Sequence, residues 1–182
     1  MAVVVAVVVR SFVAEAYYIP SASMTPQLQV DDRVVVSRLS YDLHTPHRGD
    51  IVVFAAPAGV LPADRLSSDL LLRGLDALAS AIGLSDGHDV LIKRVVALPG
   101  ETVEGRGGHV LVDGRILVEP YLASGTATST FGPFRIHAGA IWVMGDNRGN
   151  SEDSRVFGPV NEHRVVGRAI WRVWPPGRVA FL

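Results

Sequence analysis

Short runs of β-branched and other apolar residues recur along most of the chain, separated by turn-forming residues. From residue 31 onward the runs lie at 33–37, 50–54, 90–98, 140–144 and 164–173, with glycine, proline or aspartate between them. Apolar runs bounded by turn residues in this way are typical of strands. We therefore predict an all-β fold made of two antiparallel β-sheet subdomains.

A hairpin is the most specific local prediction. The apolar segments 109–112 and 115–118 are separated only by Asp113-Gly114. An Asp-Gly pair accepts the positive φ angles of a type I′ turn, which is the turn that best joins two antiparallel strands. We place this hairpin in a subdomain that covers residues 101–138.

One segment departs from the strand pattern. Between residues 64 and 84, leucine recurs at positions 66, 70, 71, 75 and 78, which is the spacing of a helix face. We predict a short helical insertion at 64–84. It either packs on the sheet or rests at a membrane surface, although its few basic residues would give only weak attraction to anionic lipid.

The N-terminus begins with an unbroken run of alanine and valine at residues 2–9, which ends at Arg10. A membrane-spanning helix needs about 20 mostly apolar residues, so this run is too short to span a membrane alone. We interpret residues 1–18 as a partial N-terminal membrane anchor and residues 19–182 as the folded domain. A strand or buried helix of a soluble domain, and a signal peptide that is removed, are the alternatives.

Composition excludes several classes of function. The formal net charge is −1, which argues against nucleic acid as the main partner. The chain has no cysteine, and this rules out disulfides, a thiol nucleophile and cysteine-ligated zinc. About half of the residues are apolar, so one compact domain can bury a core.

Two residues stand out as candidates for catalysis. Ser23 lies between Pro20 and Pro26, which restrict the backbone around its hydroxyl. Lys93 lies inside the apolar run 90–98, where a charged amine is costly. Burial lowers the pKa of a lysine from about 10.4, and a neutral amine can accept the proton of a serine nucleophile. The pair therefore indicates a protease that works without histidine.

A third stretch, Met-Gly-Asp-Asn-Arg-Gly-Asn-Ser-Glu-Asp-Ser-Arg at 144–155, follows a predicted strand and is rich in hydrogen-bonding side chains. The same chain carries Ile-Pro-Ser-Ala-Ser-Met-Thr-Pro at 19–26, Arg-Gly-Asp-Ile-Val-Val-Phe at 48–54, Lys-Arg at 93–94, Leu-Pro-Gly-Glu at 98–101 and Glu-Pro-Tyr-Leu at 119–122. With these motifs in this order, the chain closely resembles the type I signal peptidases, the membrane-anchored Ser/Lys proteases of bacteria.

The resemblance implies a role for each matching residue. Ser23 matches the nucleophile and Lys93 the general base. Ser21 matches the serine whose hydroxyl joins the backbone N–H of the nucleophile in the oxyanion hole. Ser151 matches the serine that hydrogen-bonds the lysine amine.

Three further residues match positions that brace the site. Asp153 and Arg155 correspond to a charged pair, and Asp146 to a neighbouring acid. Arg94 adjoins the base, so it should point to the opposite face of its strand and be solvated or ion-paired.

The resemblance also implies a reaction and a location. It predicts a serine endopeptidase that removes signal peptides from exported preproteins after small residues, in an Ala-x-Ala-like pattern, at the outer membrane surface. Its partners would be preproteins and membrane lipid, it would be a single-pass cell-membrane protein, and it needs no metal or organic cofactor. Ile19, Pro20 and residues 91–96 are candidates for lining the substrate pockets.

Three alternatives are less favoured. A self-cleaving repressor-type Ser/Lys peptidase shares the chemistry but needs an upstream DNA-binding domain, which residues 1–18 do not supply. A catalytically silent, membrane-associated β-domain has no reason to keep both Ser23 and Lys93. A Ser/His/Asp hydrolase is disfavoured because the sequence has no Gly-x-Ser-x-Gly motif.

Overall fold

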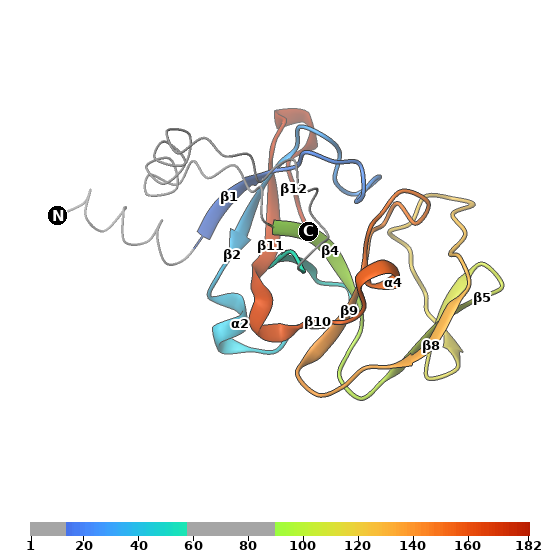
Figure 1. Ribbon diagram of the computed structural model, residues 1–182. Helices are drawn as coiled ribbons and strands as arrows, with labels where there is room; N and C mark the ends of the chain where they lie inside the picture. Colours follow the sequence, from blue (N-terminus) through green and yellow to red (C-terminus); the bar gives the residue numbers. More distant parts are fainter. Residues whose placement is uncertain (1–13, 58–89) are drawn as a thin grey trace, which may run out of the picture.

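The computed structural model describes residues 14–57 and 90–182, and it confirms the predicted all-β fold (Figure 1). The described strands form one larger and one smaller antiparallel sheet. The predictions for residues 1–13 and for the insertion at 64–84 concern segments outside the described residues. Residues 14–18, the end of the predicted anchor segment, form a strand of the larger sheet.

The larger sheet has the strand order β1-β2-β11-β3-β4-β9-β10, with β12 paired to β11. Its strands are β1 (Ala14–Tyr18), β2 (Arg33–Ser37), β3 (Ile51–Ala55), β4 (Val90–Ala97), β9 (Ala140–Met144), β10 (Val160–Asn161), β11 (Val165–Trp174) and β12 (Ala180–Phe181). The apolar runs at 33–37, 50–54, 90–98, 140–144 and 164–173 therefore correspond to strands β2, β3, β4, β9 and β11 of this sheet.

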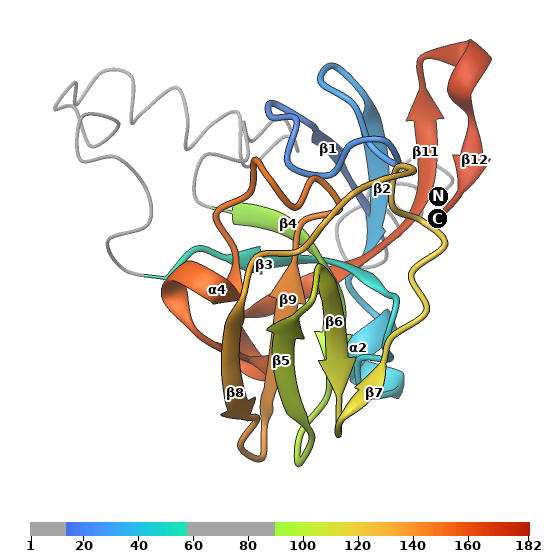
Figure 2. The ribbon, with the colours of Figure 1, turned by 90° about the vertical axis from the view of Figure 1, so that its right-hand side faces the viewer.

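The smaller sheet has the order β7-β6-β5-β8 and falls within residues 101–138 (Figure 2). Its strands are β5 (Thr102–Arg106), β6 (His109–Val112), β7 (Arg115–Ile116) and β8 (Phe131–Arg135). Asp113 and Gly114 have φ angles of 50° and 75°, so the predicted turn with two positive φ values is confirmed.

Helical structure in the described residues is limited to single turns. These are α2 (Ser40–Leu43), α4 (Ser154–Phe157), and the 3₁₀ turns η2 (Glu162–Arg164) and η3 (Pro176–Arg178). Among the residues that the structure describes, no helix combines the length and apolar character required to cross a membrane.

The core anchors the segment between β1 and β2, which carries Ser23. Ile19, Met24 and Leu28 of this segment are fully buried and pack with Val34 and Val36 of β2. Full burial of each such side chain contributes about 1.5–3 kcal/mol. The segment is therefore held by its own apolar residues, although it has no regular secondary structure.

Candidate active site

The turn around Ser23 is fixed by backbone hydrogen bonds as well as by packing. The Thr25 N–H donates to the Ala22 carbonyl at 3.2 Å, and the Leu28 N–H donates to the Met24 carbonyl at 2.9 Å. Ser23 itself is 8% exposed. The serine hydroxyl therefore projects from a rigid, partly covered turn.

Lys93 of β4 reaches this hydroxyl from the neighbouring part of the sheet. Its Nζ donates to Ser23 Oγ at 2.9 Å and to the Ile92 carbonyl at 2.9 Å. The lysine is only 3% exposed. Burial lowers the pKa of Lys93 to about 8, although the nearby carboxylates of Asp153, Glu152 and Asp146 act in the opposite direction.

The two supporting serines differ in how they meet this pair. Ser21 Oγ donates to Ser23 Oγ at 3.3 Å. Ser151 Oγ is buried but has no hydrogen-bond partner among the described residues, so the predicted bond to the lysine amine is not formed in this structure. A buried hydroxyl without a partner is rare in proteins, and it leaves Ser151 able to accept or donate a bond during a reaction.

Gly145, at the end of β9, is a residue whose importance the sequence analysis missed. A Cβ atom at this position would lie 2.2 Å from Ser151 Oγ and 2.5 Å from the Ser23 carbonyl oxygen. Real Cβ atoms do not approach other atoms so closely. The absence of a side chain therefore lets Ser151 and the Ser23 turn pack against the same point of the backbone.

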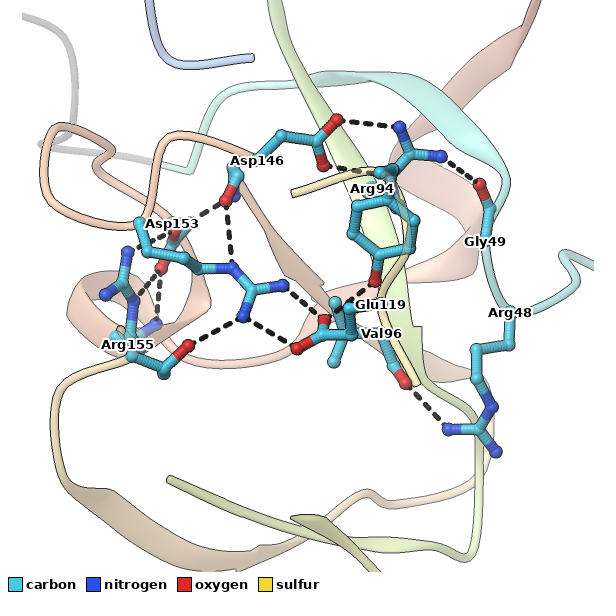
Figure 3. Close-up of polar contacts among 12 residues, drawn as sticks. Arg48, Gly49, Arg94, Val96, Glu119, Asp146, Asp153 and Arg155 are labelled. Atoms are coloured by element: carbon cyan, nitrogen blue, oxygen red, sulfur yellow. Dashed lines mark hydrogen bonds and ion pairs between the residues drawn. The ribbon is translucent and has the colours of Figure 1, made fainter. Parts of the chain in front are cut away.

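Arg94 and Asp146 lie on the other face of β4. Arg94 Nε and Nη2 donate to the two carboxylate oxygens of Asp146 at 2.8 and 2.7 Å, and Nη1 donates to the Gly49 carbonyl at 2.7 Å (Figure 3). The guanidinium also stacks 4.0 Å from the centre of the Tyr121 ring. The sequence predicted that Arg94 is either solvated or ion-paired. In the structure it is ion-paired, and its side chain is buried rather than solvated.

Asp153 and Arg155 form the other predicted charged pair. Arg155 donates from Nε and Nη2 to the two Asp153 oxygens, each at 2.8 Å (Figure 3). Asp153 also accepts the Gly145 N–H at 3.0 Å. Burial alone would raise the pKa of Asp153, but these hydrogen bonds outweigh burial and hold it below its usual value.

Arg148 is a second residue that the sequence analysis did not single out. It is buried, and it donates from Nε to the Gly145 carbonyl at 3.2 Å and from Nη1 to Thr128 Oγ1 at 2.7 Å. Its guanidinium is also paired with the Glu119 carboxylate, which accepts the Tyr121 hydroxyl at 2.7 Å. A buried arginine needs an anionic partner, so the arginine of the Asp-Asn-Arg run could have suggested an ion pair. The sequence does not reveal which carboxylate is the partner.

A small pocket lies beside the Ser23 turn. It has a volume of about 30 Å³ and is lined by residues of β1, β3, β4 and the start of the turn, namely Tyr17, Tyr18, Ile19, Pro20, Val53, Val90, Leu91 and Ile92. Ile19, Pro20, Leu91 and Ile92 are among the candidates for pocket lining. The predicted residues 93–96 do not line this pocket.

This arrangement can perform nucleophilic acyl transfer. A hydroxyl on a rigid turn contacts an amine whose pKa is lowered by burial, and a second hydroxyl lies within reach of the first. These are the elements that a serine hydrolase needs when its base is an amine rather than an imidazole. Fold and site thus define a class, an all-β hydrolase with a serine beside a buried lysine.

Comparison with known proteins gives the family. Residues 1–174 match the family described as signal peptidase, peptidase S26. The chain is 41% identical over 182 residues to signal peptidase I of Leptolyngbya laminosa, covering 100% of this chain and 79% of that protein. It is 40% identical over 181 residues to the probable signal peptidase I-2 of a Synechocystis strain, covering 100% of this chain and 72% of that protein. Signal peptidase I of Mycobacterium tuberculosis is 39% identical over 209 residues, covering 98% of this chain and 71% of that protein.

The chain therefore belongs to the signal peptidase I family of S26 peptidases. The resemblance that the sequence motifs indicated is confirmed, and the protein is a peptidase of the family that removes signal peptides.

Proposed function

We propose that this peptidase removes signal peptides from exported preproteins with Ser23 as nucleophile and Lys93 as general base. The observation that carries the proposal is the 2.9 Å contact between Lys93 Nζ and Ser23 Oγ, made by an amine that is 3% exposed. With a pKa of about 8, roughly one lysine in ten is neutral at pH 7, which is sufficient for a general base.

The reaction begins when Ser23 Oγ attacks the scissile carbonyl carbon and its proton moves to the neutral Lys93 amine. The tetrahedral intermediate collapses as Lys93 returns that proton to the leaving amine, which releases the mature protein. The signal peptide remains as an ester on Ser23. Lys93 then takes a proton from water, and the resulting attack hydrolyses the ester and regenerates the serine.

Ser21 and Ser151 assist this sequence from two sides. The Ser21 hydroxyl, 3.3 Å from Ser23 Oγ, is close enough to donate to the negative oxygen of the intermediate together with the Ser23 N–H. The Ser151 hydroxyl has no partner in the resting site, and we assign it to the lysine amine during the reaction. Asp146, Asp153 and Arg155 hold the surrounding backbone and form no bond with the substrate.

The small pocket supports cleavage after small residues. A volume of about 30 Å³, lined in part by Ile19, Val53 and Leu91, suits a methyl-sized side chain better than a large one. The preprotein would bind as an added strand, because β4 is paired with β9 only from Arg94 onward in the described residues. Residues 90–92 of β4 then offer a sheet edge beside the pocket and the nucleophile.

Location at the outer membrane surface, with a single-pass anchor, completes the proposal. The aromatic side chains of Trp171, Trp174 and Phe181 are 41%, 51% and 81% exposed on the β11–β12 hairpin. In membrane proteins, tryptophan is enriched at the interface between membrane and water. Membrane lipid would thus be a partner beside the preprotein, and the catalytic domain would lie on the extracytoplasmic side.

Cleavage of a preprotein by four proteins tests the chemistry: wild type, Ser23→Ala, Lys93→Ala and Lys93→Arg. We expect all three variants to be inactive, because arginine cannot lose its proton near neutral pH and so cannot replace a lysine base. Ser40→Ala, on α2, serves as a matched control and should cleave at the wild-type rate.

Three results would contradict the proposal. An active Lys93→Arg enzyme would exclude Lys93 as general base. Cleavage by Ser23→Ala at the wild-type rate would exclude Ser23 as nucleophile, and absence of cleavage by wild type would favour a silent binding domain. Thermal melting of each variant separates loss of chemistry from loss of fold.

A further inference from the structure

The peptide unit that joins Ala22 to Ser23 is held from outside its own turn by Asn147. The Asn147 side-chain Nδ2 donates to the Ala22 carbonyl at 3.1 Å and to Thr25 Oγ1 at 3.1 Å. The backbone N–H of Asn147 donates to the Ser23 carbonyl at 3.0 Å. One residue, distant in sequence, therefore holds both carbonyls that flank the Ser23 backbone N–H.

The Ala22 carbonyl is unusually well satisfied. Besides Asn147 it accepts the Thr25 N–H at 3.2 Å and the Thr25 hydroxyl at 2.9 Å. Three donors thus converge on one oxygen, whereas a typical turn carbonyl accepts one or two. This carbonyl cannot rotate away from the Asn147 side without losing all three hydrogen bonds.

Fixing this carbonyl also fixes the Ser23 N–H. The Ala22–Ser23 peptide bond is trans. In a planar trans peptide the carbonyl and the following N–H point in opposite directions. With the Ala22 oxygen aimed at Asn147, the Ser23 N–H must aim to the opposite side of the turn. A flip of this peptide would replace that donor by a carbonyl oxygen, which repels a developing negative charge.

We propose that Asn147 is a positioning residue that orients the Ser23 backbone N–H for the oxyanion hole. The inference rests on the proposed function, since it assumes that Ser23 is the nucleophile. Asn147 does not touch the reacting atoms. It acts through the Ala22 carbonyl. The loop after β9 thereby helps to stabilise the transition state, because it fixes the direction of the Ser23 N–H.

The chemistry of the contact explains why asparagine is suited to this position. The Ala22 carbonyl can only accept, so the group that faces it must be the amide nitrogen, and the second N–H of that nitrogen reaches Thr25 Oγ1. Aspartate has the same shape but only acceptor atoms. It would lose the hydrogen bond to the Ala22 carbonyl and repel that carbonyl, and it could bond Thr25 only by drawing the Thr25 hydroxyl proton away from the Ala22 oxygen.

The position of Asn147 is itself fixed by its neighbours on the loop. The preceding Asp146 is paired with Arg94, and the following Arg148 donates to the Gly145 carbonyl and is paired with Glu119. A rigid loop can therefore hold the Ser23 peptide in one orientation before substrate arrives. Such preorganisation is what makes an oxyanion hole effective.

Steady-state cleavage of a short peptide substrate by the full chain tests this role, with Asn147→Asp and Asn147→Ala as variants. Removal of one oxyanion donor typically costs 10²–10³ in kcat. Misorientation of that donor should cost less, so we expect kcat to fall about 10–100-fold with KM changed less than about threefold. Asn150→Ala, an exposed residue of the same loop, is the matched control and should be unchanged.

A tetrahedral inhibitor distinguishes this role from a purely structural one. A peptide boronate forms a tetrahedral adduct on the serine that places an oxygen in the oxyanion hole, whereas the peptide product of cleavage forms no such adduct. For Asn147→Ala, which adds no charge near Lys93, we expect boronate affinity to fall in parallel with kcat/KM, while product affinity and the pH midpoint of kcat/KM stay at their wild-type values.

Each other outcome is decisive. Unchanged kcat in Asn147→Asp, or a lower kcat with unchanged boronate affinity, overturns the inference. A shifted pH midpoint in the uncharged Asn147→Ala also overturns it, because the effect would then act through Lys93. If Asn147→Asp melts below the assay temperature, Thr25→Val takes its place, because it removes the hydrogen bonds of Thr25 Oγ1 to the Ala22 carbonyl and to Asn147. This variant must then show parallel but smaller losses of kcat/KM and boronate affinity. If wild type and Ser23→Ala cleave equally, the proposed function fails instead.

Discussion

At the scale of single residues, Lys93 determines how this site depends on pH. It is the single lysine of the chain, since the other sixteen basic residues are arginines. We expect kcat/KM to rise with pH and to level off above a midpoint near 8, because only the neutral amine accepts the Ser23 proton. Peptide cleavage between about pH 5.5 and 9.5 measures the midpoint.

The single lysine allows a direct check of that midpoint. In protein labelled with ¹³C-lysine, one side-chain signal titrates, and its pKa should equal the kinetic midpoint near 8. A signal that titrates near 10.5 would show that burial does not neutralise Lys93. A kinetic midpoint below about 6.5, with the lysine still charged, would indicate a histidine base instead.

Burial of Lys93 also makes the fold less stable than it could be. The pKa falls from 10.5 in the unfolded chain to about 8 in the fold, which corresponds to about 3 kcal/mol. Below pH 8 the fold must bury the charged amine and bears this full cost. Between pH 8 and 10.5 only the unfolded chain binds the proton, so the folded state gains stability as the pH rises.

We therefore expect Lys93→Met to be inactive but more stable than wild type at pH 6. The difference in unfolding free energy should shrink by about 3 kcal/mol as the pH approaches 10.5. Urea unfolding at pH 6, 8 and 10 measures it. A difference that does not change with pH would contradict the assignment of a lowered lysine pKa.

Gly145 gives a steric prediction at the same scale. A methyl group there would meet Ser151 Oγ at 2.2 Å and the Ser23 carbonyl at 2.5 Å, so the Ser23 turn must move. A displacement of about 1 Å at a catalytic group can cost 10²-fold, and we expect Gly145→Ala to lose about that much kcat/KM. Gly149→Ala on the same loop meets no atom within 4 Å and is the control. Equal activity of both variants would contradict the prediction.

At the scale of elements, the pattern of apolar residues predicted the strands in which several consecutive residues are apolar. β2, β3, β4, β9 and β11 all coincide with apolar runs in the sequence. The strands β5 and β8 were missed because their sequences, Thr-Val-Glu-Gly-Arg and Phe-Gly-Pro-Phe-Arg, contain glycine or proline and little apolar character. Their pairing depends on contacts across the sheet, such as Val103 opposite Phe134, that no local pattern reveals.

The same limit applies to the site. The sequence suggested Ser23 and Lys93 because a restricted turn and a buried amine are local features. The partners of Gly145, Asn147 and Arg148 could not be predicted, since their contacts are with Ser23, Ala22 and Glu119 in distant segments. Spacing along the chain does not tell which of several carboxylates a buried arginine will meet.

The Arg148–Glu119 pair joins the segment between β7 and β8 of the smaller sheet to the loop after β9. The two side chains are 1% and 7% exposed, so removal of one partner leaves a buried charge without compensation. We expect Glu119→Ala to lower the free energy of unfolding by about 3–5 kcal/mol and to reduce activity through Gly145. Chemical denaturation and peptide cleavage measure the two effects.

Arg106→Ala is the control for this prediction. Arg106 is paired with Glu104 on the surface, with the arginine side chain 67% exposed, and such pairs contribute about 0–1 kcal/mol. A loss below about 1 kcal/mol in Glu119→Ala would show that the pair does not hold the two elements together.

At the scale of the whole molecule, the site lies on the larger sheet, and the smaller sheet and the β11–β12 hairpin occupy different regions around it (Figures 1 and 2). The hairpin presents Trp171 stacked on Phe181 with ring centres 5.4 Å apart, and Trp174 at the end of β11 is 51% exposed. The remaining tryptophan, Trp142, is 1% exposed in the core. The fluorescence of the two surface tryptophans therefore depends on their surroundings, and the fluorescence of the buried Trp142 serves as the reference.

If the hairpin enters the membrane interface, lipid-attached bromine should quench Trp171 and Trp174 but not Trp142. We expect clear quenching by phospholipid vesicles brominated near the headgroups, and Trp171→Phe with Trp174→Phe should abolish it. Replacing Trp171, Trp174 and Phe181 by alanine should slow cleavage of a vesicle-bound preprotein about tenfold or more, because substrate and enzyme are then no longer bound to the same membrane surface. Cleavage of a short soluble peptide should remain unchanged. Ile116→Ala with Val118→Ala removes exposed apolar residues from the smaller sheet and should change neither rate. An unquenched hairpin, or equal losses on both substrates, would place the membrane contact elsewhere.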